Sequence, residues 1–364
     1  MTETPPLTIG ILTIPDRLHL LESLAASLSD AMDNYDSNIE ILVAGNSIDP
    51  AAELLRDVVT CPVSKIETDG TAPAGRHRII ETARTDWVLF VDDDCRVDIR
   101  LLIAYANEIE KADETTGAVY GPLIFEGPRS RAFEAYRFTP FIHPLQIAMW
   151  RDEVEWAPTA NALFSTSAVR DVGNFDIENP IAVSGEDVNI GLRLEAAGYD
   201  LLTAPTAKVY HTTESWNGVR DNLRRCYTYG LSEAWLVHQY PDRTRPLGGQ
   251  ALSISLASGL LIFWVVIFTL FTIPLLFLIW GIRLAYRWST IDSDTSLLSY
   301  ALADCYSLAN SIGYVRQTVH SEAPLGQVTR RFKFYSYPYL HTRIREEGVW
   351  HASDGSEPDD SETS

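Results

Sequence analysis

The sequence predicts an α/β fold, with a mostly parallel sheet flanked by helices, followed by a C-terminal transmembrane segment. The first half of the 364-residue chain alternates short apolar runs with amphipathic stretches, which is the order of repeated strand and helix units. No charged residue lies between Arg245 and Arg283. That interval is longer than the roughly 20 apolar residues that cross a bilayer as a helix.

The apolar runs and the helical spacings place the individual elements. Strands are expected at Leu7–Thr13, Ile39–Ala44, Val63–Glu67 and Trp87–Val91, and helices at Leu18–Ala31, Pro50–Val59, Arg76–Ala83 and Leu101–Ala112. The pattern is irregular from Val119 to Trp156 and rich in aromatic residues and proline, which predicts long loops over a site. Regular structure is expected again at Asn161–Val172, with helices at Val188–Ala197 and Asn222–His238 and strands at Tyr199–Thr203 and Ala207–Tyr210. Ligands of such sheets gather at the carboxyl ends of the strands.

Charge and cysteine content narrow the functional classes. The chain has 49 acidic and 29 basic residues, a formal net charge of −20. This predicts an acidic surface suited to high salt and argues against nucleic-acid binding, which needs clustered Lys and Arg. Four widely spaced cysteines, with no paired zinc spacing, predict reduced and mostly buried thiols. The N-terminus lacks the features of a signal peptide, so the first domain is expected to be cytoplasmic.

The apolar segment Leu252–Ile282 is divided by Pro274, so it forms either one kinked helix or a hairpin of two short helices. Arginines at both ends slightly favour a hairpin with both ends cytoplasmic. The amphipathic stretch Leu297–Val319 is expected to lie on the membrane or against the catalytic domain. Arg330–Arg345, where basic and aromatic residues alternate, suits either an anionic headgroup surface or a solvated face.

These observations divide the chain into four parts. The expected division is a catalytic domain over residues 1–240, a transmembrane segment over 251–288, a membrane-proximal helical and basic segment over 289–350, and a disordered acidic tail over 351–364.

The strongest chemical signal is Asp92-Asp93-Asp94, directly after the apolar strand Trp87–Val91. Three adjacent carboxylates repel one another unless a cation neutralises them. Mg²⁺ and Mn²⁺ prefer oxygen ligands and often share them with substrate phosphates. The run therefore indicates a divalent-metal site, and the alternative is an exposed acidic turn.

A second signal is Gly185-Glu186-Asp187, just before a predicted helix. Acidic residues at this position also complement the helix dipole with no further role. His211 follows a predicted strand, and an isolated histidine is more often a hydrogen-bonded bystander than a ligand. Neither signal is decisive alone.

Taken in order, these motifs resemble the inverting family 2 glycosyltransferases of the GT-A fold. The matching stretches are FVDDDCRVD at Phe90–Asp98, GNFD at Gly173–Asp176, GEDVNIGLRLEAAGY at Gly185–Tyr199 and AKVYH at Ala207–His211. LTIGILTIPDR at Leu7–Arg17 resembles the family's first strand, and PAGRHRIIETA at Pro73–Ala83 resembles the segment before its Asp-x-Asp pair. The resemblance covers roughly residues 7 to 240.

The resemblance implies a role for each matched residue. Asp94 and His211, with Asp92, would hold Mn²⁺ or Mg²⁺ against the donor diphosphate. Asp187 would be the general base that accepts the proton of the acceptor hydroxyl, and Glu186 would position the acceptor or the base. One displacement with one base implies inversion at the anomeric carbon. The residues implied in donor binding are Thr13, Arg17, Asn46, Arg76, Asp92 and Asp93.

The sequence departs from the family pattern at three positions. Asn46 stands where an acidic residue usually contacts the nucleobase, which leaves the base open. His77 replaces the usual Asn after Arg76, and Asn189 stands where a second Asp is common.

Membrane-bound members of the family often use lipid-linked acceptors, and Tyr227-Thr228-Tyr229-Gly230 resembles a membrane-proximal stretch in such enzymes. The implied partners are a nucleotide-sugar donor, a lipid-linked or glycan acceptor and membrane lipids, at the cytoplasmic face of the cell membrane. Two other functions stay open. A nucleotidyltransferase also uses acidic metal sites, although no lysine-containing phosphate loop is present. The other is a non-catalytic, membrane-bound module of the same fold.

Overall fold

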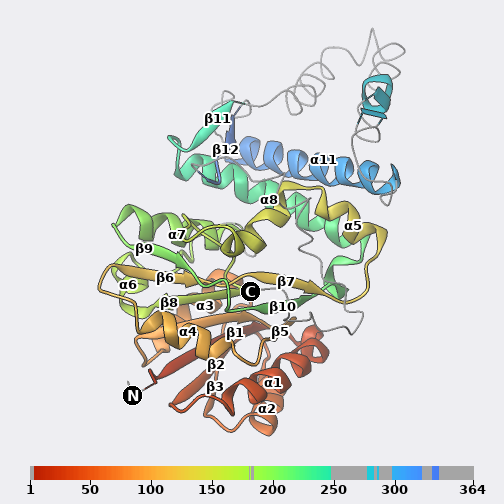
Figure 1. Cartoon of the computed structure of the whole chain (residues 1–364). Helices are drawn as coiled ribbons and strands as arrows, with labels where there is room; N and C mark the ends of the chain where they lie inside the picture. Colours follow the sequence, from red (N-terminus) through yellow and green to blue (C-terminus); the bar gives the residue numbers. More distant parts are fainter. Residues whose placement is uncertain are drawn as a thin grey trace, which may run out of the picture.

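The structure is a computed structural model that describes residues 4–179, 181, 184–246, 277–282, 285–286, 297–321 and 330–335 (Figure 1). Most of the predicted transmembrane segment and the whole acidic tail lie outside these residues. Among the residues described, none of the helices combines the length and the apolar character needed to cross a membrane.

A seven-stranded sheet forms the centre of the molecule, in the order β3-β2-β1-β4-β8-β6-β9. The first four strands of the order are mutually parallel, β8 is antiparallel to both of its neighbours, and β9 is parallel to β6. This confirms the predicted α/β class with a mostly parallel sheet. The strands are β1 (Leu7–Thr13), β2 (Ile39–Gly45), β3 (Val63–Glu67), β4 (Trp87–Asp92), β6 (Thr116–Tyr120), β8 (Asn161–Ser165) and β9 (Asp200–Thr203).

Helices cover both faces of this sheet because alternate side chains of each strand point to opposite faces. On β4, Leu89 and Val91 are buried in one apolar cluster, whereas Val88 and Phe90 are buried in another. The first cluster includes side chains from α1 (Leu18–Met32), α2 (Asp49–Val58) and α4 (Leu101–Ile109). The second includes side chains from α3 (Ala72–Thr82), α6 (Thr166–Asp171) and α7 (Glu186–Ala196).

A second sheet of three strands, β5-β10-β7, lies beside the carboxyl end of β4. Its strands are β5 (Cys95–Val97), β7 (Leu123–Glu126) and β10 (Val209–Thr212). The expectation of long loops over Val119–Trp156 was partly wrong, because β7, α5 (Arg131–Arg137) and the 3₁₀ segment η2 (Pro140–Met149) lie there. Elements this short carry too few residues for a periodic pattern. His211 also lies inside a strand, opposite Cys95, and not after one.

The helix α8 (Val219–Gln239) lies between the central sheet and the helix α11 (Leu297–His320), as Figure 1 shows. The two helices approach very closely at Gly230 and Gly313. A Cβ atom at Gly230 would lie 1.9 Å from the Asn310 carbonyl oxygen, and one at Gly313 would lie 2.0 Å from the Tyr227 carbonyl oxygen. Only glycine allows this contact between backbones.

A small antiparallel ribbon joins the ends of this helix pair. It pairs β11 (Thr244–Pro246) with β12 (Arg330–Phe332). Beside it, the guanidinium group of Arg331 donates hydrogen bonds to the buried carboxylate of Glu233 on α8 and to the side-chain oxygen of Asn310 on α11. The Glu233 carboxylate also accepts the backbone N–H of Phe332 at 3.1 Å. Residues on both sides of the apolar interval are therefore fastened to α8.

Candidate active site

The carboxyl ends of four parallel strands meet at one edge of the central sheet. In register, Leu12 is opposite Asp92, Thr13 is opposite Gly45, and Gly45 is opposite Glu67. The polar residues predicted to bind the donor begin at this edge, as expected for an α/β sheet. Asn46 follows β2 there and is exposed.

Asp93 supports the site from beneath its surface. Its side chain is only 2% exposed, its Oδ2 accepts the Thr13 hydroxyl at 2.7 Å, and its Oδ1 lies 2.9 Å from the Arg17 guanidinium. Burial raises the pKa of Asp93 to about 7, although Arg17 opposes that shift. Protein groups thus occupy both of its oxygens. Thr13 and Asp93 hold Arg17 in place here, and their predicted donor contacts remain predictions.

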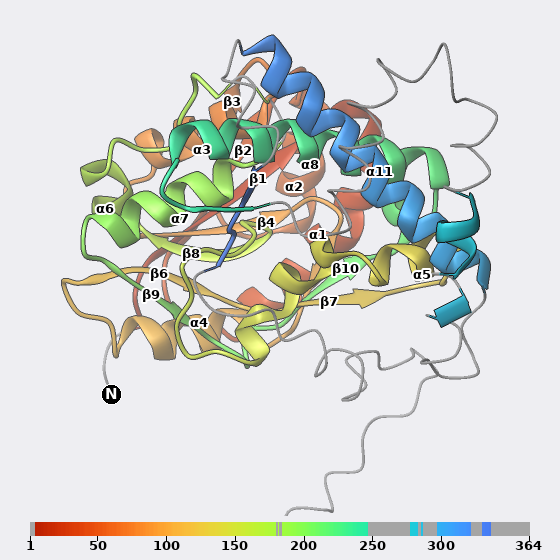
Figure 2. The same cartoon turned by 90° about the horizontal axis from the view of Figure 1, so that it is seen from above.

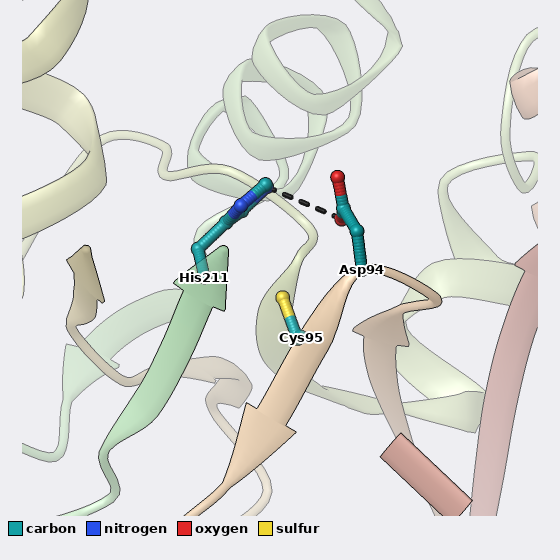
Figure 3. Close-up of side chains that lie close together, drawn as sticks. All are labelled: Asp94, Cys95 and His211. Atoms are coloured by element: carbon teal, nitrogen blue, oxygen red, sulfur yellow. Dashed lines mark ion pairs between the residues drawn. The ribbon is translucent and has the colours of Figure 1, made fainter. Parts of the chain in front are cut away.

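Asp94 and His211 form the centre of the site (Figure 3). The Asp94 Oδ1 lies 3.3 Å from the His211 Nε2, and both side chains are buried. The Asp94 Oδ2 accepts the Ser215 hydroxyl at 3.1 Å and lies 2.5 Å from Arg17. Burial alone would raise the pKa of Asp94, but His211 and Arg17 hold it below its ordinary value. Asp94 is therefore the carboxylate best suited to remain ionised.

The pairing of His211 prepares it for a metal ion. Its Nδ1 lies 3.1 Å from the backbone oxygen of Thr212. A carbonyl oxygen can only accept, so Nδ1 carries a proton and Nε2 is the ring nitrogen that faces Asp94. Metal-binding histidines usually donate their second N–H in this way. Asp94 Oδ1 accepts no hydrogen bond among the described residues. A cation that displaced any proton from Nε2 would therefore have one oxygen and one nitrogen ligand here.

Cys95 lies next to this pair, and its sulfur completes a group of three possible metal ligands with Asp94 and His211 (Figure 3). Burial, together with the charge of Asp94, raises the pKa of the Cys95 thiol well above its ordinary value. A neutral thiol is a poor ligand, and Mg²⁺ and Mn²⁺ prefer oxygen. Cys95 was not predicted as a site residue, because its neighbour across the strands, His211, is remote in sequence.

Asp92 lies apart from that group and close to Arg76. Its Oδ1 is 3.4 Å from the Arg76 guanidinium, which also donates to the Glu186 carboxylate at 2.5 Å. Arg76 thus connects the end of β4 with the start of α7. Asp92 is absent from the group of metal ligands that the described residues form, so its predicted metal contact remains a prediction.

Glu186 and Asp187 occupy the first turn of α7, which begins after Gly185 in the left-handed conformation at φ +88°. A glycine is favoured there because other residues rarely adopt this φ. The Glu186 Oε2 is buried and has no hydrogen-bond partner in the described ranges. Burial and the neighbouring charge of Glu186 raise the pKa of Asp187 to about 7. Asp187 is therefore able to accept a proton near neutral pH.

Two tyrosines near Asp187 were not predicted as site residues. Burial and the charge of Asp187 raise the pKa of Tyr120, whose side chain is fully buried. Tyr229 on α8 is also influenced by Asp187, although burial is the main cause of its raised pKa. Tyr229 belongs to the stretch that resembles membrane-bound relatives. Nothing in the sequence pointed to Tyr120 as a site residue, because a tyrosine at the end of an apolar strand looks like an ordinary core residue.

A mostly parallel sheet with acidic groups at the end of β4 and at the start of α7 is the arrangement of GT-A glycosyltransferases. The chain belongs to glycosyl transferase family group 2, whose family model matches residues 87–288. The match includes Asp94, Asp187 and His211. The chain is therefore a member of a glycosyltransferase family.

The curated relatives agree with this assignment. The chain is 36% identical over 198 residues to pre-mycofactocin glycosyltransferase from two strains of Mycobacterium tuberculosis, CDC 1551 and H37Rv. The matched region is 51% of this chain and 40% of each relative, so the chain spans less than half of their length.

A solved structure shares the fold over most of its length. The mannosyltransferase PcManGT from Pyrobaculum calidifontis, in complex with GDP-Man and Mn²⁺, superposes with a TM-score of 0.52. The alignment covers 86% of this chain and 88% of that protein at 16% identity. At 16% identity, this similarity shows that the two proteins share a fold and nothing further.

Proposed function

We propose that the protein transfers a sugar, with inversion, from a nucleoside diphosphate sugar to a lipid-linked or glycan acceptor at the membrane face. The observation that carries the proposal is that one site contains two groups suited to different steps, a candidate metal site and a candidate base. The Asp94 Oδ1 and the His211 Nε2 face one another at 3.3 Å, and Asp187 in the first turn of α7 has a raised pKa. Arg76 lies between the two centres, in contact with Asp92 and Glu186.

Asp94 and His211 would hold Mn²⁺ or Mg²⁺, which would supply positive charge for the diphosphate leaving group. The Mn²⁺ in PcManGT supports this choice of metal. Arg17 lies beside Asp93 and Asp94, and it offers a second positive charge near the same place. Thr13 and Asp93 keep that arginine in position.

In the reaction, the acceptor oxygen attacks the anomeric carbon while the bond from that carbon to the diphosphate oxygen breaks. Asp187 takes the acceptor proton, and the nucleoside diphosphate leaves with its bonding electron pair. Glu186, fixed by Arg76, positions the acceptor. A single displacement of this kind inverts the anomeric configuration.

The membrane location rests on the apolar interval between Arg245 and Arg283, which is long enough to enter a bilayer. Because α11 and β12 pack against α8, and β11 pairs with β12, the interval starts and ends near the catalytic body, which comprises the two sheets and the helices around them. This supports the hairpin over the single crossing, with the active site on the cytoplasmic side of the cell membrane. A lipid-linked acceptor would be presented at that surface.

The test is a screen of UDP-, GDP- and dTDP-sugars, each with Mn²⁺, Mg²⁺ or excess chelator. It measures the thermal unfolding midpoint and the release of nucleoside diphosphate. We expect one donor class to raise the midpoint only when metal is present. Asp94→Asn and His211→Ala should lose that metal-dependent rise in the midpoint. Their metal affinity should fall by at least about 10–100-fold, which is the loss typical of mutating a group that only supports a metal ligand.

The matched control is Asp57→Asn, since Asp57 is an exposed carboxylate on α2. It should behave as the wild type. Full turnover by the wild type in excess chelator would refute the metal assignment. Binding of a donor without release of diphosphate in the presence of any acceptor would instead favour the non-catalytic module.

A further inference from the structure

The helix α11 has two clearly different faces. The inner face packs on α8 and α5, and its buried residues recur at helical spacing. Those residues include Ala303, Tyr306, Asn310, Gly313, Tyr314 and Thr318. α11 is therefore part of the catalytic body and not a separate segment.

The outer face of α11 is also apolar, although it is exposed. Leu298, Leu308, Ile312 and Val319 are 48%, 42%, 53% and 64% exposed. Cys305 is exposed on the same face, and the charged residues on this side of the helix are Arg316 and the half-buried Asp304. A surface helix in water normally carries polar residues opposite its buried side. An extended apolar face on the outside indicates an interaction surface.

The short helical piece of the chain beside α11 continues this surface. Phe277, Leu278 and Ile282 are 63%, 60% and 61% exposed. The Trp280 indole N–H donates to the Asp304 carboxylate at 3.0 Å, which fixes this piece against α11. Figures 1 and 2 place α11 on the outside of α8, away from the central sheet.

We propose that the outer face of α11 lies on the hydrocarbon boundary of a lipid bilayer, so that α11 is a helix on the membrane surface. This rests on the proposed membrane location. The uncharged interval leaves the catalytic body at Pro246 on β11, and its far end, Phe277–Ile282, lies against α11. The far end therefore meets α11 directly, and the near end leaves from the ribbon of β11 and β12, whose Arg331 contacts Asn310 on the same helix. A bilayer that accepts the interval also reaches α11.

The same helix supports the active site through an aromatic cluster. Tyr306 on the inner face of α11 is buried with Tyr136 and Trp216. The Tyr306 hydroxyl donates to the Ala132 backbone oxygen at 3.3 Å, and the ring of Trp216 lies 5.5 Å from the ring of His211. Contact of α11 with lipid would therefore hold the metal side of the site at a fixed distance from the bilayer surface.

Cys305 allows a direct test in the full-length protein. Cys95 and Cys226 are buried, so Cys61→Ser leaves Cys305 as the accessible thiol of the described residues. A fluorophore on Cys305 is measured with vesicles of phosphatidylcholine and phosphatidylglycerol whose acyl chains carry a quencher. We expect the lipid quencher to reduce the emission of the Cys305 label. Aqueous iodide should no longer quench this label once vesicles are present. A control label at Glu53→Cys on α2, in a Cys61→Ser/Cys305→Ser background, should respond to iodide alone.

A paired substitution tests the residues themselves. Leu308→Gln/Ile312→Gln should lower the lipid-contacting population of α11 by about tenfold or more, because two exposed apolar side chains that lipid would remove from water are replaced by polar ones. Ile99→Gln/Ile177→Gln changes two equally exposed isoleucines elsewhere, 54% and 58% exposed, and should leave the quenching unchanged.

The possible outcomes separate this inference from the proposed function. If the protein floats with vesicles but the Cys305 label responds only to iodide, the α11 proposal is wrong and the membrane location stands. If the protein does not float with vesicles, both are wrong. Release of nucleoside diphosphate, measured in the same samples, tests glycosyl transfer independently of either.

Discussion

At the scale of single residues, the surroundings of Asp187 suit the role of base that we propose for it. Burial and the adjacent carboxylate of Glu186 both disfavour its ionised form, and together they raise its pKa to about 7. Its backbone neighbour Val188 and the guanidinium of Arg76 oppose the shift. A base is most effective when its pKa is near the working pH.

Asp187→Asn should lower turnover by about 10²–10⁴-fold, because it removes the base and keeps the shape of the side chain. Only the ionised carboxylate accepts a proton, so the wild-type rate should fall as the pH drops below about 7. The residual rate of Asp187→Asn should lack this fall. The measurements are pH profiles of turnover, with donor affinity measured at each pH.

Asp93 is the competing explanation for such a profile, since burial raises its pKa to about 7 as well. Its protonation would weaken the contact with Arg17 and so reduce donor affinity. If the low-pH fall persists in Asp187→Asn and appears in donor affinity, Asp93 causes it. If Glu186→Gln proves inactive while Asp187→Asn keeps near-normal turnover, the two roles must be exchanged.

Asp94 and Asp187 could be chosen as candidates from the sequence, because carboxylates at a strand end and a helix start form short motifs. Their roles stay predictions, and the contacts that surround them were not foreseen. The pairing of Arg76 with Glu186, separated by 110 positions, depends on how α3 and α7 pack across the sheet edge. No local pattern contains that information, and the same holds for Cys95 beside His211.

At the scale of elements, long strands and helices were predictable because their periodicity extends over several residues. β1, β3 and α1 were placed nearly to the residue. The three-residue strands β5, β11 and β12 were not, because pairing with distant partners defines them. The close contact of α8 with α11 depends on two glycines, which in sequence look like ordinary helix-weakening positions.

Gly230→Ala and Gly313→Ala should each destabilise the protein by about 1–3 kcal/mol or more, as overpacking does. The new methyl group would meet a backbone oxygen, so the helices would have to separate. The gain in helix propensity, about 1 kcal/mol, opposes this cost. The thermal unfolding midpoint in detergent measures the net effect.

Gly281→Ala is the matched control, because a Cβ atom there would meet nothing within 4 Å. It should be neutral or slightly stabilising. A Gly230→Ala protein as stable as the wild type would mean that α8 and α11 are not in close contact.

At the scale of the whole molecule, segments that the apolar interval separates in sequence pack against one another in the fold. The chain leaves the catalytic body after β11 and returns with α11 and β12, which pack on α8 and β11. The sequence suggested that the catalytic part stops near residue 240, because the family resemblance ends there and the uncharged interval begins soon after, at Arg245. Hydropathy cannot indicate that a later segment returns to the same surface.

This arrangement predicts different outcomes for two deletions. Replacing residues 247–296 with a flexible Gly/Ser linker of roughly 30 residues, which spans about 30 Å, removes the apolar interval and keeps α11. That protein should fold, purify without detergent and release nucleoside diphosphate from its donor. The full-length protein should sediment with membranes, because its uncharged interval is long enough to enter a bilayer.

A protein that ends at residue 246 loses the same interval but also loses α11 and β12. Glu233 would then keep a buried charge without Arg331, and removing one partner of a buried ion pair typically costs about 3–5 kcal/mol. We expect it to aggregate or to melt well below the linker protein. Equal stability of the two would show that α11 is not part of the catalytic body. Full-length protein in the soluble fraction without detergent would rule out the membrane segment.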